Sequence, residues 1–229
     1  MKTVAIVSGG MDSSVLIYDL FSQGHELDLI SFNYGQKHKI ELTYAAKISK
    51  QLNLPHTIVD ITNLTSLLSK STLTSDAPVP DGHYAEENMK LTVVPNRNSI
   101  MLNIAAAYAI TNEASAIATA VHSGDHFIYP DCRPAFIDAL ENLLRVANDG
   151  FLPADFQVLA PYVHISKDRI CARGAELDVP WLDTWSCYKG GETHCGSCGT
   201  CFERREAFTL AGISDPTPYL AEPMYKDPR

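Results

Sequence analysis

Basic residues and long hydrophobic segments are both scarce in this chain. It has 18 lysines and arginines against 27 aspartates and glutamates, which gives a net charge of -9 over 229 residues. A protein that wraps nucleic acid needs a basic surface to neutralise phosphates, so we expect no nucleic-acid partner. The longest apolar segment, residues 100–110, contains Asn103 and falls well short of the ~20 residues of a membrane span. We therefore expect no membrane partner.

The start of the sequence also lacks an export signal. Its apolar run covers only residues 3–7, whereas a secretory signal has a longer apolar region and then a small-residue cleavage site. We expect a cytoplasmic protein, in which thiols stay reduced. The six cysteines then need an explanation other than disulfide bonds.

Apolar runs alternate with amphipathic stretches along most of the chain, and these repeated strand–helix units predict an α/β fold: a parallel sheet with helices on both faces. Residues 71–93 show no period, and a loop of this length is usually functional, so we interpret them as a lid. We expect an α/β domain over residues 1–180 and a cysteine-rich tail over 181–229. The expected strands are 3–7, 27–32, 56–61, 116–121 and 156–162, and the expected helices are 12–21, 38–52, 99–112, 134–147, 167–177 and 202–210.

A glycine turn follows the first expected strand, with the sequence SGGMDSS over residues 8–14. Glycines let a backbone approach a ligand closely, and the N-terminus of the following helix offers free N–H groups to a phosphate. The GxxxxGK[ST] and GxGxxG motifs are both absent, which excludes the two best-known phosphate loops. The alternative interpretation is a tight structural turn in which Asp12 caps the helix.

Four cysteines lie close together in the tail, at Cys187, Cys195, Cys198 and Cys201. Four thiolates satisfy tetrahedral zinc and leave no open position, so the site would be structural. An iron–sulfur cluster is an alternative, although the ferredoxin spacing is absent. A redox-active CxxC pair is less consistent with this tail. His194 could replace one of the four ligands.

The segment SGGMDS resembles the signature of the PP-loop ATP pyrophosphatases, which transfer AMP from ATP to a substrate oxygen. Together with the cysteine tail it resembles the 7-cyano-7-deazaguanine synthase family of queuosine biosynthesis, over nearly the whole chain. Asn33 stands where that family would have an acidic residue. The other motifs that carry the resemblance are YGQKH at 34–38, VPNRN at 94–98, YPDCRP at 129–134, Lys167, and CGSCGTCFERREAF at 195–208.

The resemblance implies a Rossmann-like PP-loop fold with a zinc-binding tail, and a ligase that forms carbon–nitrogen bonds. Its substrates would be 7-carboxy-7-deazaguanine, ammonia and ATP, and its product the nitrile, formed through adenylated acid and amide intermediates. ATP, Mg²⁺ and structural zinc are the implied cofactors, and a homodimer is a candidate assembly. The alternative is a PP-loop enzyme that modifies tRNA by thiolation or lysidine formation, but the acidic composition disfavours it.

The resemblance also implies roles for individual residues. Arg97 has a structural alternative, because a residue after a proline loop can simply support the helix that follows it. We interpret His38 and His122 as loop or packing histidines. The expected catalytic residues are Asp12, Lys167 and Arg97, the expected ATP-binding residues are Ser8, Gly9, Gly10, Met11, Asp12, Ser13 and Ser14, and the expected substrate-binding residues are Asp125, Asp131, Arg133 and Arg204.

Overall fold

The computed structural model describes residues 1–84 and 87–221 and contains a five-stranded, fully parallel sheet with the strand order β3-β2-β1-β4-β5. The predicted fold class is confirmed. Strands β4 and β5 are shorter than expected, because the chain leaves the sheet after Ala118 and Leu159 and continues as loops. The strands are β1 Lys2–Ile6, β2 Glu26–Asn33, β3 His56–Asp60, β4 Ala116–Ala118 and β5 Gln157–Leu159.

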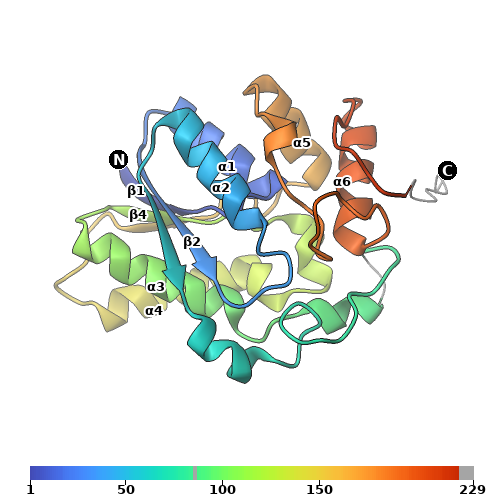
Figure 1. Cartoon of the computed structure of the whole chain (residues 1–229). Helices are drawn as coiled ribbons and strands as arrows, with labels where there is room; N and C mark the ends of the chain where they lie inside the picture. The colour runs from blue at the N-terminus through green and yellow to red at the C-terminus, as the bar shows by residue number, and fades with distance from the viewer. Residues whose placement is uncertain (85–86, 222–229) are drawn as a thin grey trace.

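Helices cover both faces of the sheet, with α1, α2 and α5 on one face and α3 and α4 on the other (Figure 1). Alternate strand residues supply the two cores: Val4 and Ile30 face α3, whereas Ala5 and Leu29 face α1. Strands buried on both faces read as continuous apolar runs, which is why the sequence pattern predicted them. The helices are α1 Met11–Ser22, α2 Glu41–Leu52, α3 Arg97–Thr111, α4 Pro134–Ala147, α5 Lys167–Glu176 and α6 Gly199–Leu210.

The segment 71–93 is tied to the rest of the molecule at several points. Leu73 is fully buried, and its carbonyl accepts a hydrogen bond of 3.0 Å from the backbone N–H of Lys37. Farther along, the N–H of Gly82 donates to the carbonyl of Ser197 over 3.1 Å, and a short 3-10 helix covers Glu87–Thr92. The segment therefore packs against the cysteine-rich tail, and its action as a lid stays a prediction.

The tail closes over the N-terminal glycine turn. The backbone N–H of Trp185 donates a 2.8 Å hydrogen bond to the carbonyl of Gly9, and the Trp185 side chain is buried in the same core as strand β1. On helix α6, Phe208 meets the ring of Trp181 edge to face, with centroids 5.0 Å apart. The boundary at residue 180 stays a prediction, and many contacts cross it.

Candidate active site

The glycine turn between β1 and α1 requires a glycine at position 9. Gly9 has φ +81°, and a Cβ atom there would lie 2.3 Å from the carbonyl oxygen of Glu41 and 2.7 Å from the nitrogen of Ala45. The hydroxyls of Ser13 and Ser14 both donate to the carbonyl of Gly10, over 3.1 and 2.8 Å. The turn is thus a rigid loop that presents the N-terminus of α1, the kind of site that binds anions.

Asp12 does not cap helix α1. The N-cap residue is Gly10, and no side chain caps the helix there. The carboxylate of Asp12 instead points to Lys167 at the start of α5, with Oδ2 3.0 Å from the ammonium nitrogen. Its other oxygen, Oδ1, is buried and without a hydrogen-bond partner. The interpretation of Asp12 as the cap of this helix is therefore wrong.

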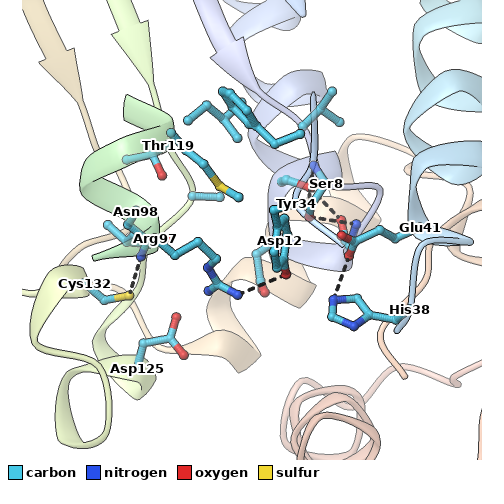
Figure 2. A pocket seen from close by; sticks show the side chains of 18 of the residues that line it. Ser8, Asp12, Tyr34, His38, Glu41, Arg97, Asn98, Thr119, Asp125 and Cys132 are labelled. Atoms are coloured by element: carbon cyan, nitrogen blue, oxygen red, sulfur yellow. Dashed lines mark hydrogen bonds and ion pairs between the residues drawn. The ribbon is translucent and has the colours of Figure 1, made fainter. Parts of the chain in front are cut away.

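A cavity opens beside the turn and is shown in Figure 2. Its walls come from the ends of β1 and β2, the start of α2, the start of α3 and the loop after β4. Ligands of open α/β sheets bind outside the carboxyl ends of the strands, and this cavity lies there. The expected site residues that line it are Ser8, Gly10, Asp12, Ser13, Arg97 and Asp125.

Lys167 is the centre of a buried charged network. Its ammonium lies 2.7 Å from Glu203 Oε2 in addition to its contact with Asp12. Burial lowers the pKa of Lys167, but Asp12, Glu203 and Asp125 together raise it above its ordinary value, so the ammonium stays charged. Burial raises the pKa of Asp12, but Lys167 and His122 outweigh it, so this carboxyl stays ionised.

His122, Asp125 and Glu203 form a possible cation site beside this network. The imidazole Nε2 lies 3.4 Å from Asp125 Oδ2 and 3.9 Å from Glu203 Oε1, and the three ligand atoms lie within 4.8 Å of one another. Burial raises the pKa of Asp125, and Glu203 adds to this rise. Together with the unpartnered Oδ1 of Asp12, the group offers oxygen ligands of the kind that Mg²⁺ prefers.

Arg97 is positioned at the first turn of α3 by an unusual residue before it. Asn96 adopts the left-handed conformation with φ 58°, which turns the chain into the helix. The Arg97 guanidinium then donates to the hydroxyl of Tyr34 over 3.3 Å and lies within the cavity wall (Figure 2). Among the interactions that the structure describes for it, the guanidinium forms no ion pair with a carboxylate.

Several expected site residues lie outside the cavity wall. Met11 is buried among Cys171 and Phe208, on the far side of the turn. Asp131 accepts the backbone N–H of Asn98 over 3.4 Å and so supports the start of α3. The other expected residues outside the wall are Gly9, Ser14, Lys167, Arg133 and Arg204.

Arg204 connects parts of the tail. It is fully buried, and its guanidinium lies 3.4 Å from Asp215 and 2.8 Å from the hydroxyl of Thr184. A further bond reaches the carbonyl of Trp181. These contacts hold α6 against the chain before the cysteines, and a direct contact of Arg204 with substrate stays a prediction.

Four functional candidates were missed or underrated by sequence reasoning: His38, Glu41, His122 and Glu203. His38 and His122 were interpreted as packing histidines, yet His38 lines the cavity and His122 contacts Asp12. Glu203 lies in the segment CGSCGTCFERREAF, two residues after the last clustered cysteine, but nothing in that segment distinguishes it from its neighbours. The residue acts at the site only because α6 packs on α5.

The four tail cysteines come together as expected. The Sγ atoms of Cys198 and Cys201 are 3.5 Å apart, those of Cys195 and Cys201 are 3.9 Å apart, and all four sulfurs lie within 4.8 Å. Zinc–sulfur bonds of about 2.3 Å in a tetrahedron place sulfurs about 3.8 Å apart, so the group fits one ion. His194 accepts a hydrogen bond from the Ser186 N–H at Nε2 instead of joining the group.

The chain is similar over most of its length to one family of known proteins. The family model described as "Queuosine biosynthesis protein QueC" matches residues 2–212. A 7-cyano-7-deazaguanine synthase of Brucella anthropi is 58% identical over 219 residues, which covers 96% of this chain and 94% of that protein. One of Rhizobium etli is 54% identical over 226 residues, covering 99% and 95%.

Solved structures share the fold at much lower identity. A predicted subunit of tRNA methyltransferase from Methanocaldococcus jannaschii superposes with a TM-score of 0.51 at 17% identity, covering 97% of this chain and 94% of that one. The NMN synthetase of Francisella tularensis gives 0.51 at 13% identity, covering 93% and 77%. These likenesses concern the fold alone.

Proposed function

Because the chain belongs to the family of the queuosine biosynthesis protein QueC, we propose that its cavity is the catalytic site of 7-cyano-7-deazaguanine synthesis. The chain is an ATP-dependent enzyme that forms carbon–nitrogen bonds. One observation carries the assignment of the site: the glycine turn and the Lys167–Asp12 pair meet at the edge of a cavity whose opposite wall holds Arg97.

The first half of the reaction activates the carboxylate of 7-carboxy-7-deazaguanine. A carboxylate is a poor electrophile, because its leaving group would be oxide. Attack of its oxygen on the α-phosphate of ATP releases pyrophosphate and leaves AMP as a good leaving group. The turn amides would hold the phosphates, and Lys167 would neutralise charge that develops there. Arg97 would hold the substrate carboxylate with its planar fork.

The second half repeats the activation on the amide. Ammonia displaces AMP from the acyl adenylate and gives the amide. A second ATP transfers AMP to the amide oxygen, and loss of AMP with the remaining N–H protons gives the nitrile. The same residues serve both activations, because the oxygen occupies the same place beside the α-phosphate. Water must be kept out, since it would hydrolyse the acyl adenylate.

The proposed function would use two metal ions, which two separate groups of residues would hold. The four tail cysteines would hold structural zinc, because their four sulfurs lie close enough together to fill all the positions of one tetrahedral ion. Mg²⁺ would be held by carboxylates of the charged network, Asp12 and Asp125 among them, and would neutralise the triphosphate. An iron–sulfur cluster is less favoured, since its thiolates bind separate irons and need a wider arrangement.

A tRNA-modifying enzyme is the weaker alternative. Relatives of 54% and 58% identity over nearly the whole chain are synthases, whereas the tRNA enzymes share only the fold at below 20% identity. None of the described helices is long and apolar enough to cross a membrane. A homodimer and a cytoplasmic location stay predictions, the first of which sedimentation can check.

The direct test incubates purified protein with ATP, Mg²⁺, ammonium and 7-carboxy-7-deazaguanine. We expect the mass of the nitrile, together with AMP and pyrophosphate, because attack on the α-phosphate leaves those two products. Chromatography that found ADP and phosphate instead would contradict adenylation. Supplying the amide with ATP and no ammonia should also give the nitrile, since no second nitrogen enters.

A further inference from the structure

His38 has a buried imidazole, and one of its two ring nitrogens has no hydrogen-bond partner in the structure. It lies in the loop before α2, its side chain is 4% exposed, and it lines the cavity. Its Nδ1 is buried and has no hydrogen-bond partner, whereas its Nε2 faces Glu41. A buried polar atom is almost always paired, so one that lines a cavity without a partner indicates a ligand atom that binds there.

Glu41 lies on the other side of the imidazole, at the first residue of α2. Its Oε2 is 3.4 Å from His38 Nε2 (Figure 2). Its Oε1 accepts a 2.9 Å hydrogen bond from the side-chain amide of Gln36. Gln36 is in turn fixed by a 3.0 Å bond to the carbonyl of Phe32. The carboxylate therefore orients the imidazole, as in the carboxylate–histidine pairs of nucleophilic enzymes.

The charged and titratable groups around this pair come from three other elements. Arg97 faces it from α3, Tyr34 follows β2, and Tyr188 comes from the tail, with its ring 5.1 Å from that of His38. Burial and Arg97 lower the pKa of His38 to about 3, so the imidazole stays neutral. Burial raises the pKa of Glu41 to about 7, against the opposing effects of Gln36 and Arg97.

The proposed reaction must remove protons from nitrogen at both halves. Ammonium must lose a proton before its lone pair can attack the acyl adenylate, and the amide must lose its N–H protons to become a nitrile. A base with a pKa near the working pH performs such transfers best. The network around Lys167 is unsuited to this, because its carboxylates neutralise a cation that faces the phosphates.

We infer that His38 and Glu41 act together as the proton acceptor for the nitrogen that this enzyme adds to its substrate. This inference rests on the proposed function. The N–H of ammonium, and later of the adenylated amide, gives its proton to Nδ1 of His38, while the hydrogen on Nε2 passes to Glu41. In the last step the N–H electron pair forms the third carbon–nitrogen bond as the carbon–oxygen bond to AMP breaks. The imidazole ends neutral with its hydrogen on Nδ1, and the proton rests on Glu41. Before the next transfer, Glu41 returns that proton to Nε2 and Nδ1 gives its own to solvent.

The test separates adenylation from proton removal in Glu41→Gln and His38→Gln variants. ATP–pyrophosphate exchange with the acid needs no nitrogen, so we expect it to stay near wild type. Conversion of the amide to the nitrile should fall about 100-fold, the low end of what a general base contributes. Hydroxylamine is neutral at pH 7, so with the acid it should still give the hydroxamate. Exposed Glu26→Gln and His164→Gln are the matched controls.

The pH profile gives a readout that a merely structural role would not move. With the amide as substrate, wild-type turnover should be full above the pKa of about 7 of Glu41 and fall as pH drops through it, because the acceptor becomes protonated. Glu41→Gln should lose that inflection. The role of the pair would be overturned if ATP–pyrophosphate exchange and nitrile formation fell together in the variants. It would also be overturned if both variants turned over the amide at the wild-type rate. No exchange in the wild type would instead overturn the proposed function itself.

Discussion

Lys167 and Arg97 are cations with different surroundings, and this difference is consistent with the different roles proposed for them. Lys167 is balanced by Asp12 and Glu203 at 3.0 and 2.7 Å, so its ammonium is held in one place beside the glycine turn. The guanidinium of Arg97 has only the hydroxyl of Tyr34 as a described hydrogen-bond partner. The first is suited to phosphates, whose charge changes during transfer, and the second to a substrate anion.

Replacing Lys167 with alanine should slow both halves of the reaction. The side chain stabilises the same phosphates each time, so acid-to-amide and amide-to-nitrile conversion should both fall by ~100-fold, as for other electrostatic stabilisers. Single-turnover rates on the acid and on the amide measure the two halves. Exposed Lys50→Ala is the control and should leave both rates unchanged. A variant that blocked only one half would point to two different activation sites.

Sequence reasoning identified Asp12 and Lys167 as candidates and missed residues whose place at the site depends on packing. Asp12 and Lys167 were assigned to one site, and they do form an ion pair. Glu203 could not be found, because a glutamate in a helix is ordinary until α6 is known to lie against α5. His38 was discounted although it ends the segment YGQKH, because the motif indicates no role for it, and only the structure shows its unpartnered Nδ1.

Elements were predicted best where one periodic pattern covered the whole element. Helix α4 has the expected bounds, Pro134–Ala147, because a proline starts it and its apolar face continues to the end. Helix α2 begins at Glu41 instead of residue 38, since the chain first turns His38 into the cavity. Strands β4 and β5 stop early because the apolar residues after them pack in loops rather than in the sheet.

The glycine turn permits a graded test of backbone strain. Gly9→Ala should cost about 1–2 kcal/mol for the left-handed conformation, plus about 1–3 kcal/mol for forcing Cβ against helix α2. Gly24 also has a positive φ, +79°, but its Cβ would meet nothing within 4 Å, so Gly24→Ala should show the first cost alone. Denaturant unfolding measures both. Equal destabilisation would mean that the close approach of α2 at Gly9 is not a constraint.

At the scale of the whole molecule, the cysteine cluster is part of the main core. Cys187, Cys198 and Cys201 are buried in the same cluster as strand β1 and helices α3 and α4. Loss of the metal would therefore leave polar thiolates within the core rather than on a separate appendage. Metal binding and folding are expected to be coupled.

Cys198→Ser should remove one ligand and, with it, the metal. Elemental analysis of the wild type should find about one zinc per chain, as a closed four-thiolate site holds a single ion. The variant should contain much less and unfold at a lower temperature. Cys171→Ala, a buried cysteine outside the cluster, should keep its zinc. A soluble, metal-free and fully active Cys198→Ser protein would contradict a structural metal, and iron with labile sulfide would contradict zinc.

The hydrogen bond from Trp185 to Gly9 joins two parts of the chain that leave the ribosome far apart in time. The glycine turn emerges with the first strand, but its final backbone partner is synthesised only after most of the sheet and helices. During synthesis, the glycine turn therefore exists for some time before the residue that donates a hydrogen bond to Gly9 has been made. Because Trp185 lies two residues before Cys187, disorder in the cysteine tail would also remove a backbone partner of Gly9 at the other end of the sequence.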